Sequence, residues 1–157
     1  MASYDILVVC TGNICRSPMA EGLIKGMLPK AVQAQISVSS AGTHAIHGNQ
    51  ASDFAVQVMQ SHGVDIASHR ARMLSKRMLK NADLILVMET NHLKYIRFMS
   101  FFGMKKTHRI SEFDKNCEPY DLPDPIGGDI EQYRATALLL KTCVKGVSEY
   151  LEETLQT

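Results

Sequence analysis

The chain has 157 residues, of which 45% are hydrophobic and 21% are charged, and its net charge at pH 7 is +1. This length suits one domain over residues 1–157, and the small net charge gives no support to a broad nucleic-acid or membrane surface. Asp5 interrupts the N-terminal apolar run, so we expect neither a signal peptide nor a membrane span. We therefore expect a cytoplasmic protein whose four cysteines are free thiols.

The N-terminal segment predicts a strand, a loop and a helix in that order. Tyr4 to Cys10 is a continuous apolar run bounded by Gly12, which indicates a buried strand. Ser17-Pro18 then places a capping residue directly before a proline, which predicts that Ser17 is the N-cap of a helix. Pro29 is expected to end that helix.

The rest of the chain alternates predicted strands and helices. Strands are expected at Ile36–Ser39, at Asp83–Met88 and, as an edge strand, at Thr107–Ile110, and helices at Asp53–His62 and His92–Phe101. Loops are expected at Ser40–Thr43 and Asn116–Gly128. A last helix follows an Asp129–Gln132 capping box and carries apolar residues at spacings of three and four from Ile130 to Leu151. The alternation predicts an α/β fold with a parallel sheet.

The segment between the first strand and the first helix has the residues of a phosphate-binding loop. Ligands of such folds bind beyond the carboxyl ends of the strands, where Cys10 lies and which Ser40 follows. Backbone N–H groups in a tight loop before a helix bind anions, and the same field favours a thiolate at Cys10. Arg16, after five intervening residues, can hold two phosphate oxygens with its planar guanidinium.

Inside this loop, Gly12 and Asn13 are among the residues best able to take the left-handed backbone angles that such a loop needs, and the Ser17 hydroxyl is within reach of the thiolate. The alternative is a buried structural cysteine followed by an ordinary turn. The preceding strand, the Gly-Asn pair and the Ser-Pro helix start favour the phosphate loop. Its other members are Thr11, Ile14 and Cys15.

At this point the sequence resembles a known family, the low-molecular-weight protein tyrosine phosphatases of the bacterial type. The blocks that carry the resemblance span almost the whole chain: Val9–Glu21 (VCTGNICRSPMAE), Ser40–Thr43 (SAGT), Ser68–Arg72 (SHRAR), Ala82–Met88 (ADLILVM) and Pro123–Pro125 (PDP). The resemblance implies a single domain with a four-stranded parallel sheet and helices on both faces. It also implies a metal-free, cofactor-free reaction through a phosphocysteine.

The resemblance also implies roles for further residues. Asp124 is expected to protonate the leaving group and then to activate the water that cleaves the phosphocysteine. Ser40 and His69 are expected to brace the loop through hydrogen bonds with Asn13. Cys15 is expected as a packed thiol, as a redox partner that captures oxidised Cys10 in a disulfide, or as both. Independently of the resemblance, Asp121, three residues before Asp124, could contact the loop that carries Asp124, but a solvated charge is the first expectation.

The substrate that the resemblance implies is phosphotyrosine in a protein, with two departures from the family pattern. Ile126-Gly127-Gly128 and Ile46 stand where many members have aromatic residues. The Asp-Pro-x-Gly-Gly pattern resembles the protein-arginine phosphatases of the same family, but these carry Thr at the position of Ile14. Because Ile14 favours an aromatic ring at the pocket wall, phosphotyrosine is the first expectation and phosphoarginine the alternative.

Other classes of protein fit the sequence less well. A thioredoxin-coupled arsenate reductase would need two cysteines soon after the third strand, and none occurs before Cys117. A catalytically dead phospho-residue binding module would not need Cys10, Arg16 and Asp124 together. The cysteine spacing does not suit zinc. By analogy with bacterial members, the expected partner is a tyrosine kinase or one of its targets, and the expected state is a monomer or weak dimer.

Overall fold

The computed structural model describes residues 3–156, and a parallel sheet is at its centre. The sheet has the strand order β2-β1-β3-β4, formed by β1 (Tyr4–Cys10), β2 (Ile36–Gly42), β3 (Leu84–Val87) and β4 (Thr107–Arg109). Each neighbouring pair is parallel, and β1 pairs with β2 from Tyr4 opposite Ile36 to Cys10 opposite Gly42. The prediction of a four-stranded parallel sheet is confirmed, and its strands end at one edge.

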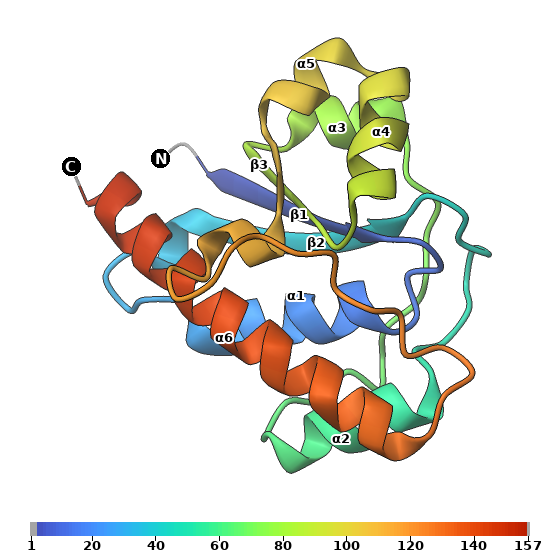
Figure 1. The fold of residues 1–157 in the computed structure, drawn as a ribbon. Coiled ribbons are helices and arrows are strands. Elements are labelled where there is room, and N and C mark those ends of the chain that lie inside the picture. Colours follow the sequence, from blue (N-terminus) through green and yellow to red (C-terminus); the bar gives the residue numbers. More distant parts are fainter. Residues whose placement is uncertain (1–2, 157) are drawn as a thin grey trace.

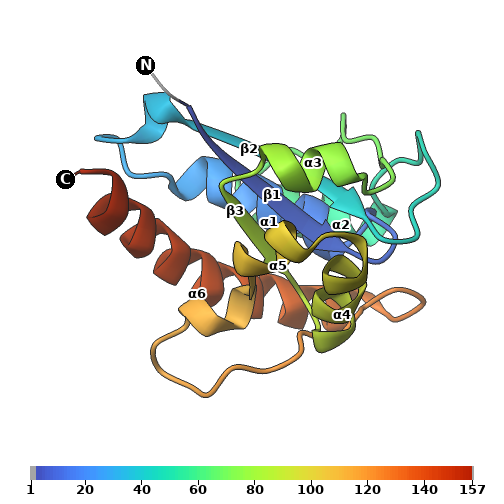
Figure 2. The same cartoon turned by 90° about the horizontal axis from the view of Figure 1, so that it is seen from above.

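Helices cover both faces of this sheet, as predicted. One face carries α1 (Arg16–Met27), α2 (Asp53–Ser61) and α6 (Ile130–Leu155), whereas α3 (Lys76–Asn81), α4 (Thr90–Met99) and α5 (Phe101–Lys105) cover the other (Figure 1). The view from above shows α3, α4 and α5 in front of the sheet (Figure 2). Two short 3-10 helices, η1 (Gln33–Gln35) and η2 (Ile110–Phe113), complete the elements.

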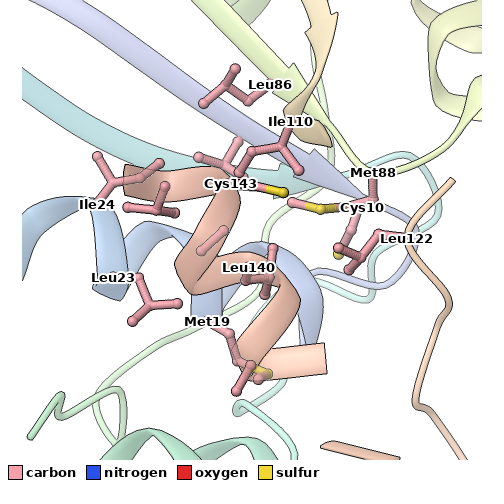
Figure 3. Close-up of a cluster of buried hydrophobic side chains, with 14 of the residues drawn as sticks. Cys10, Met19, Leu23, Ile24, Leu86, Met88, Ile110, Leu122, Leu140 and Cys143 are labelled. Carbon is pink, nitrogen blue, oxygen red and sulfur yellow. The ribbon is translucent and has the colours of Figure 1, made fainter. Parts of the chain in front are cut away.

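The two helical layers explain why the inner strands are apolar throughout. Ile6, Val8 and Cys10 of β1 belong to the core cluster under α1 and α6, part of which Figure 3 shows. Leu7 and Val9, which point the opposite way, belong to the cluster under α3 and α4. A strand buried on both faces has no polar side, so its sequence reads as a continuous apolar run.

The last helix is formed as its pattern predicts. Asp129 Oδ1 accepts a hydrogen bond from Gln132 N at 3.0 Å, and Gln132 Oε1 accepts one from Asp129 N at 2.9 Å. The apolar stripe from Tyr133 to Leu151 is buried, and α6 contacts α1, α2 and η2. The reciprocal cap and the buried stripe together define the start and the orientation of α6.

Two boundaries near the candidate site differ from the prediction. Helix α1 begins at Arg16 with Cys15 as its N-cap, and Cys15 makes no capping side-chain bond. Ser17 therefore lies inside the first turn of α1 and is not the N-cap. Its hydroxyl contacts Cys10 and Asn13 in the loop. Strand β2 continues through Gly42 because its pairing with β1 continues to Cys10, so the predicted loop at Ser40–Thr43 is wrong for its first three residues.

The α3–α5 region also differs from the prediction. The expected helix at His92–Phe101 is two helices, since Ser100 has an extended backbone, ends α4 and caps α5 by accepting from Gly103 N at 3.0 Å. Helix α3 was not predicted. Its Ser75 cap, which accepts from Met78 N, was the local signal, but six residues are too few to show a helical period.

Candidate active site

The loop from Cys10 to Arg16 connects the end of β1 with the start of α1 and leaves backbone donors unused. The first helical hydrogen bond joins Met19 N to Cys15 O at 3.1 Å. The N–H groups of the helix turn that precedes Met19 therefore have no acceptor within the helix, which suits an anion. Of the two residues best able to take a left-handed conformation, Asn13 does so with φ 58°, whereas Gly12 does not.

The sulfur of Cys10 receives polar contacts from within the loop. Ser17 Oγ lies 2.9 Å from Cys10 Sγ, and Asn13 N donates to the same sulfur at 3.3 Å. Ser17 Oγ already accepts from Asn13 Nδ2 at 2.8 Å, so its own proton is free to point at the sulfur. On its other side Cys10 belongs to the buried cluster that contains Met88 and Leu122 (Figure 3). One backbone donor, Asn13 N, and one hydroxyl that is able to donate, Ser17 Oγ, therefore face the sulfur of the buried Cys10.

Asn13 is held by partners from three segments. Its Oδ1 accepts from Arg72 N at 3.0 Å, which fixes the orientation of the amide. Its Nδ2 donates to Ser40 Oγ at 3.0 Å, and Ser40 Oγ in turn donates to Glu21 Oε1 at 2.6 Å. His69 Nε2 lies 2.7 Å from Asn13 O, which can only accept. Ser40 and His69 thus make the contacts with Asn13 that the resemblance implied.

The guanidinium of Arg16 is buried and held from two sides. Its Nη1 donates to Glu89 Oε1 at 2.5 Å and to the carbonyl of Leu122 at 2.7 Å. Its Nη2 lies 3.4 Å from Asp124 Oδ2. Glu89 supplies the negative charge that a buried guanidinium requires, so the cation can be kept in place beside the loop before any anion arrives.

Residues 121–124, which we call the Asp124 segment, are anchored to the start of α4. Asp121 Oδ1 accepts from Thr90 N and Thr90 Oγ1, each at 2.9 Å, and from Arg109 Nη1 at 3.1 Å. Partial burial raises the pKa of Asp121, but these hydrogen bonds outweigh it and lower the pKa overall. Asp121 is exposed, as expected of a solvated charge, and Thr90 and Arg109 also hold it in place. Asp124 itself accepts from Ile126 N at 3.1 Å.

His92 is a further member of the site that the sequence analysis missed. Its side chain is buried, and Nδ1 accepts from Met88 N at 3.3 Å and Glu89 N at 3.1 Å. The proton therefore lies on Nε2, which donates to Thr11 Oγ1 at 2.9 Å. Burial, and to a lesser degree the charge of Arg16, lowers the pKa of His92 to about 4. The missed signal was its place just beyond β3, at the same edge of the sheet as Cys10.

The loop and the Asp124 segment border a small pocket of about 210 Å³. Its lining residues are Cys10, Thr11, Gly12, Ile14, Cys15, Asp124 and Ile126. The pocket thus combines a thiol, a carboxyl group and two branched apolar side chains. Its volume suits one side chain rather than a large ligand, since drug-sized ligands occupy roughly 300–1,000 Å³. Ile46 is exposed.

Cys15, which lines the pocket, is a free thiol like the other three cysteines. Its Sγ is 3.3 Å from both Ser52 Oγ and Tyr133 OH, and burial raises the pKa of this thiol. Its redox role stays a prediction. Within residues 3–156, no group of three or more His, Cys, Asp or Glu side chains is arranged to hold a metal ion. No helix of the same range is both long and apolar enough to cross a bilayer.

Comparisons with known proteins agree with this geometry. The chain is 39% identical over 151 residues to a low molecular weight protein-tyrosine-phosphatase, Ptp, of Acinetobacter johnsonii, covering 96% of this chain and all of the relative. A low molecular weight protein tyrosine phosphatase from T. tengcongensis has a similar solved structure, with a TM-score of 0.86, 38% identity and coverage of 95% of this chain and 100% of that one.

A second solved structure, the YwlE arginine phosphatase from Geobacillus stearothermophilus, matches equally well in fold. Its TM-score is 0.86 at 37% identity, over 98% of this chain and 96% of that one. The family model described as low molecular weight phosphotyrosine protein phosphatase matches residues 5–157. With its phosphate loop, sheet order and nearly full-length match, the chain belongs to the low molecular weight phosphotyrosine protein phosphatase family.

Proposed function

We propose that the protein hydrolyses phosphotyrosine in protein substrates, with Cys10 as nucleophile, Arg16 as phosphate clamp and Asp124 as general acid and base. The observation that carries this proposal is the pair of polar contacts, from Asn13 N and Ser17 Oγ, on the sulfur of Cys10, which lines one pocket with Asp124. Family membership and the phosphatase relatives support it. No cofactor is required by this chemistry.

The first step transfers the phosphoryl group to the enzyme. The Cys10 thiolate attacks phosphorus, an S–P bond forms, and the bond from phosphorus to the tyrosine oxygen breaks. Asp124 donates its proton to that oxygen, so a neutral phenol leaves. Arg16 and the loop N–H groups hold the equatorial phosphate oxygens, where negative charge is concentrated in the transition state.

The second step releases inorganic phosphate. The Asp124 carboxylate takes a proton from water, the water oxygen attacks phosphorus, and the P–S bond breaks. The thiolate leaves more readily when Ser17 Oγ donates to it, and its contact with Cys10 at 2.9 Å is in place for this. Cys10 returns as thiolate and Asp124 returns protonated, so the cycle closes without a metal or a redox partner.

The substrate follows from the walls of the pocket. Ile14 and Ile126 line it, and a branched apolar side chain packs on a tyrosine ring but offers no hydrogen bond to a guanidinium. Phosphoarginine is the second candidate. It is favoured by the similarity to an arginine phosphatase and by the glycines after Ile126, of which Gly127 is left-handed with φ 78°. The chain that carries the substrate is proposed to be a bacterial tyrosine kinase or one of its targets in the cytoplasm.

The experiment that tests the proposal compares kcat/KM on phosphotyrosine, phosphoserine and phosphoarginine peptides, for the wild type and for Ile14→Thr. We expect the wild type to prefer phosphotyrosine. The threonine variant should move the ratio toward phosphoarginine by about tenfold or more, because it loses apolar contact and gains a hydrogen-bonding hydroxyl. A wild type that prefers phosphoarginine would make the second candidate the correct one, without changing the roles of Cys10 and Asp124.

A further inference from the structure

Away from the active site, three exposed phenylalanines gather where α4 meets α5. Phe98 at the end of α4 is 92% exposed, and Phe101 and Phe102 in α5 are 69% and 75% exposed. Three of the five phenylalanines of the chain thus face solvent within five consecutive positions. Both helices lie on the face of the sheet opposite α6 (Figure 1). Exposed apolar clusters of this kind mark surfaces that contact another body.

The rings are held outward by a well-defined turn. Ser100 caps α5 through Gly103 N at 3.0 Å. A Cβ added to Gly103 would lie 3.3 Å from Ser100 Cβ and 3.4 Å from Leu79 Cβ, so α5 packs closely on α3. The Phe101 and Phe102 rings meet edge to face with centroids 6.0 Å apart. The exposure of these rings is therefore a property of the fold.

The surroundings of the rings are basic. Residues 76–106 contain seven Lys and Arg residues but only two acidic residues. Both acidic side chains are engaged elsewhere, Asp83 with the backbone of Asp5 and Glu89 with Arg16. Lys106 is turned inward onto backbone carbonyls. The other six basic residues are exposed: Lys76, Arg77, Lys80, Lys94, Arg97 and Lys105.

The basic and aromatic groups are in direct contact at one point. The Nζ of Lys105 lies 5.1 Å from the ring centroid of Phe101 and 6.0 Å from that of Phe102. We call these three phenylalanines and the six exposed basic residues of the neighbouring helices α3, α4 and α5 the aromatic–basic surface. The chain-wide net charge of +1 hides this local excess, which is why composition alone gave no support to a membrane contact.

We propose that the aromatic–basic surface docks on the anionic lipid headgroups of a membrane. Lys and Arg beside an anionic bilayer are attracted to it, and phenyl rings insert at the boundary between headgroups and acyl chains. A second copy of the chain would bring like charges together. A protein partner is less well matched, because protein interfaces are depleted of lysine, and four of the six basic residues are lysines.

Helix α4 relates this surface to the active site. Its N-terminal end holds Thr90 and His92, which contact the Asp124 segment and the phosphate loop, and its other end holds Phe98. Ten helical residues span about 15 Å. A molecule docked through the aromatic–basic surface would keep its pocket close to the bilayer, within reach of phosphorylated residues near the membrane. The docking itself does not depend on the proposed reaction.

The test is co-sedimentation with vesicles of phosphatidylcholine, with and without phosphatidylglycerol. The variant is Phe98→Ser/Phe101→Ser/Phe102→Ser, and the matched control is Leu138→Ser/Leu139→Ser on α6, which also removes exposed apolar side chains. We expect the wild type and the control to bind only the vesicles with phosphatidylglycerol. The triple variant should bind them at least about tenfold more weakly, and salt should weaken binding of the wild type.

Turnover of a soluble aryl phosphate should be unchanged in the triple variant, which shows that it is folded. Arg97→Gln/Lys105→Gln should weaken binding and flatten its salt dependence. The proposal is overturned if the wild type does not bind phosphatidylglycerol vesicles, if it binds phosphatidylcholine equally, or if the triple variant binds like the wild type. If the wild type binds poly-glutamate but not vesicles, and the triple variant binds neither, the partner of this surface is an acidic protein. If the wild type is a dimer and the triple variant is a monomer, the surface binds a second copy of the chain instead of a membrane.

Discussion

At the scale of single residues, the proposed reaction depends on the proton that Asp124 donates to the leaving group. Asp124 lies 3.4 Å from Arg16 and borders the pocket of Cys10, so it can reach the oxygen of a departing group. Asp124→Asn should slow hydrolysis of alkyl and other poor leaving groups by roughly 10²–10⁴. Activated aryl phosphates should lose less in the first step, because their leaving oxygen needs little protonation.

The check is single-turnover phosphorylation of Cys10 with a series of leaving groups of different pKa. The variant should show a steeper dependence of rate on leaving-group pKa than the wild type. An equal loss for good and poor leaving groups would remove Asp124 from the role of general acid. Asp121 would not take over that role, because its carboxylate is already bound by Thr90 and Arg109.

His92 provides a second prediction at this scale, through pH. In the unfolded chain its pKa is near 6.5, and in the folded protein it is lowered to about 4. Between these values the unfolded state binds a proton that the folded state does not, so the free energy of unfolding falls as pH decreases from about 6.5 to about 4. The groups that face the ring are Arg16, which lowers the pKa, and Glu89, Asp124 and Asp121, which raise it.

The measurement is urea unfolding of the wild type and His92→Gln at pH 7.5 and 4.5, expressed as a difference between the two proteins. The wild type should be the more stable at pH 7.5, and its advantage should shrink at pH 4.5 by up to about 3 kcal/mol, the size of this pKa shift. An advantage that stays constant with pH would show that His92 is not held neutral.

Single residues also show what the sequence can and cannot predict of the site. Cys10, Arg16 and Asp124 were predicted from residue type and order. In the structure Cys10 and Asp124 line one pocket, and Arg16 lies 3.4 Å from Asp124. Glu89 was missed because its ion pair with Arg16 spans 73 positions and has no local signal. His92 was missed for the same reason, since its contact with Thr11 spans 81 positions.

At the scale of elements, the close approach of β2 to the phosphate loop requires a glycine. A Cβ on Gly42 would lie 2.5 Å from Thr11 O and 3.0 Å from Asn13 N, and neither backbone atom can move without moving the loop. Gly42→Ala should therefore lower kcat/KM by about 10²-fold, the usual effect of misplacing catalytic groups by an ångström. The fold should remain, because the rest of β2 keeps its pairing with β1.

The matched control is Gly26→Ala in α1, where an added Cβ meets nothing within 4 Å. This variant should keep full activity and gain about 0.5–1 kcal/mol of stability, since alanine is the better helix former. Aryl phosphate turnover and urea unfolding of both variants check the pair of expectations. Full activity of Gly42→Ala would mean that the loop tolerates a displaced β2.

Elements also differ in how far the sequence predicts them. The buried strands β1 and β3 and the long helix α6 were predicted, because a strand buried on both faces and a capped apolar stripe each leave a long, regular pattern. Helix α3 and the break between α4 and α5 were not, because six residues and a single extended Ser100 lie below the length at which a period is visible. The end of β2 was misjudged because pairing with β1, a non-local contact, decides it.

At the scale of the whole molecule, the two core clusters share the strands β1 and β3, so we expect residues 1–157 to unfold as one domain. Leu140→Ala affects the cluster under α1 and α6, and Leu7→Ala the one under α3 and α4. Each should lower the free energy of unfolding by about 2–5 kcal/mol in a single urea transition. Two separate transitions, each moved by only one substitution, would contradict a single domain.

The proposed mechanism passes through a covalent phosphocysteine at Cys10, which can be trapped. The wild type is mixed with a phosphotyrosine peptide, quenched in acid within a single turnover and digested, and the phosphorylated peptide is identified by mass spectrometry. We predict one phosphate on Cys10 sulfur, absent in Cys10→Ser, which should still bind an oxyanion through Arg16 and the loop N–H groups. Phosphate released in a burst without any phosphorylated Cys10, or turnover by Cys10→Ser near that of the wild type, would contradict the mechanism.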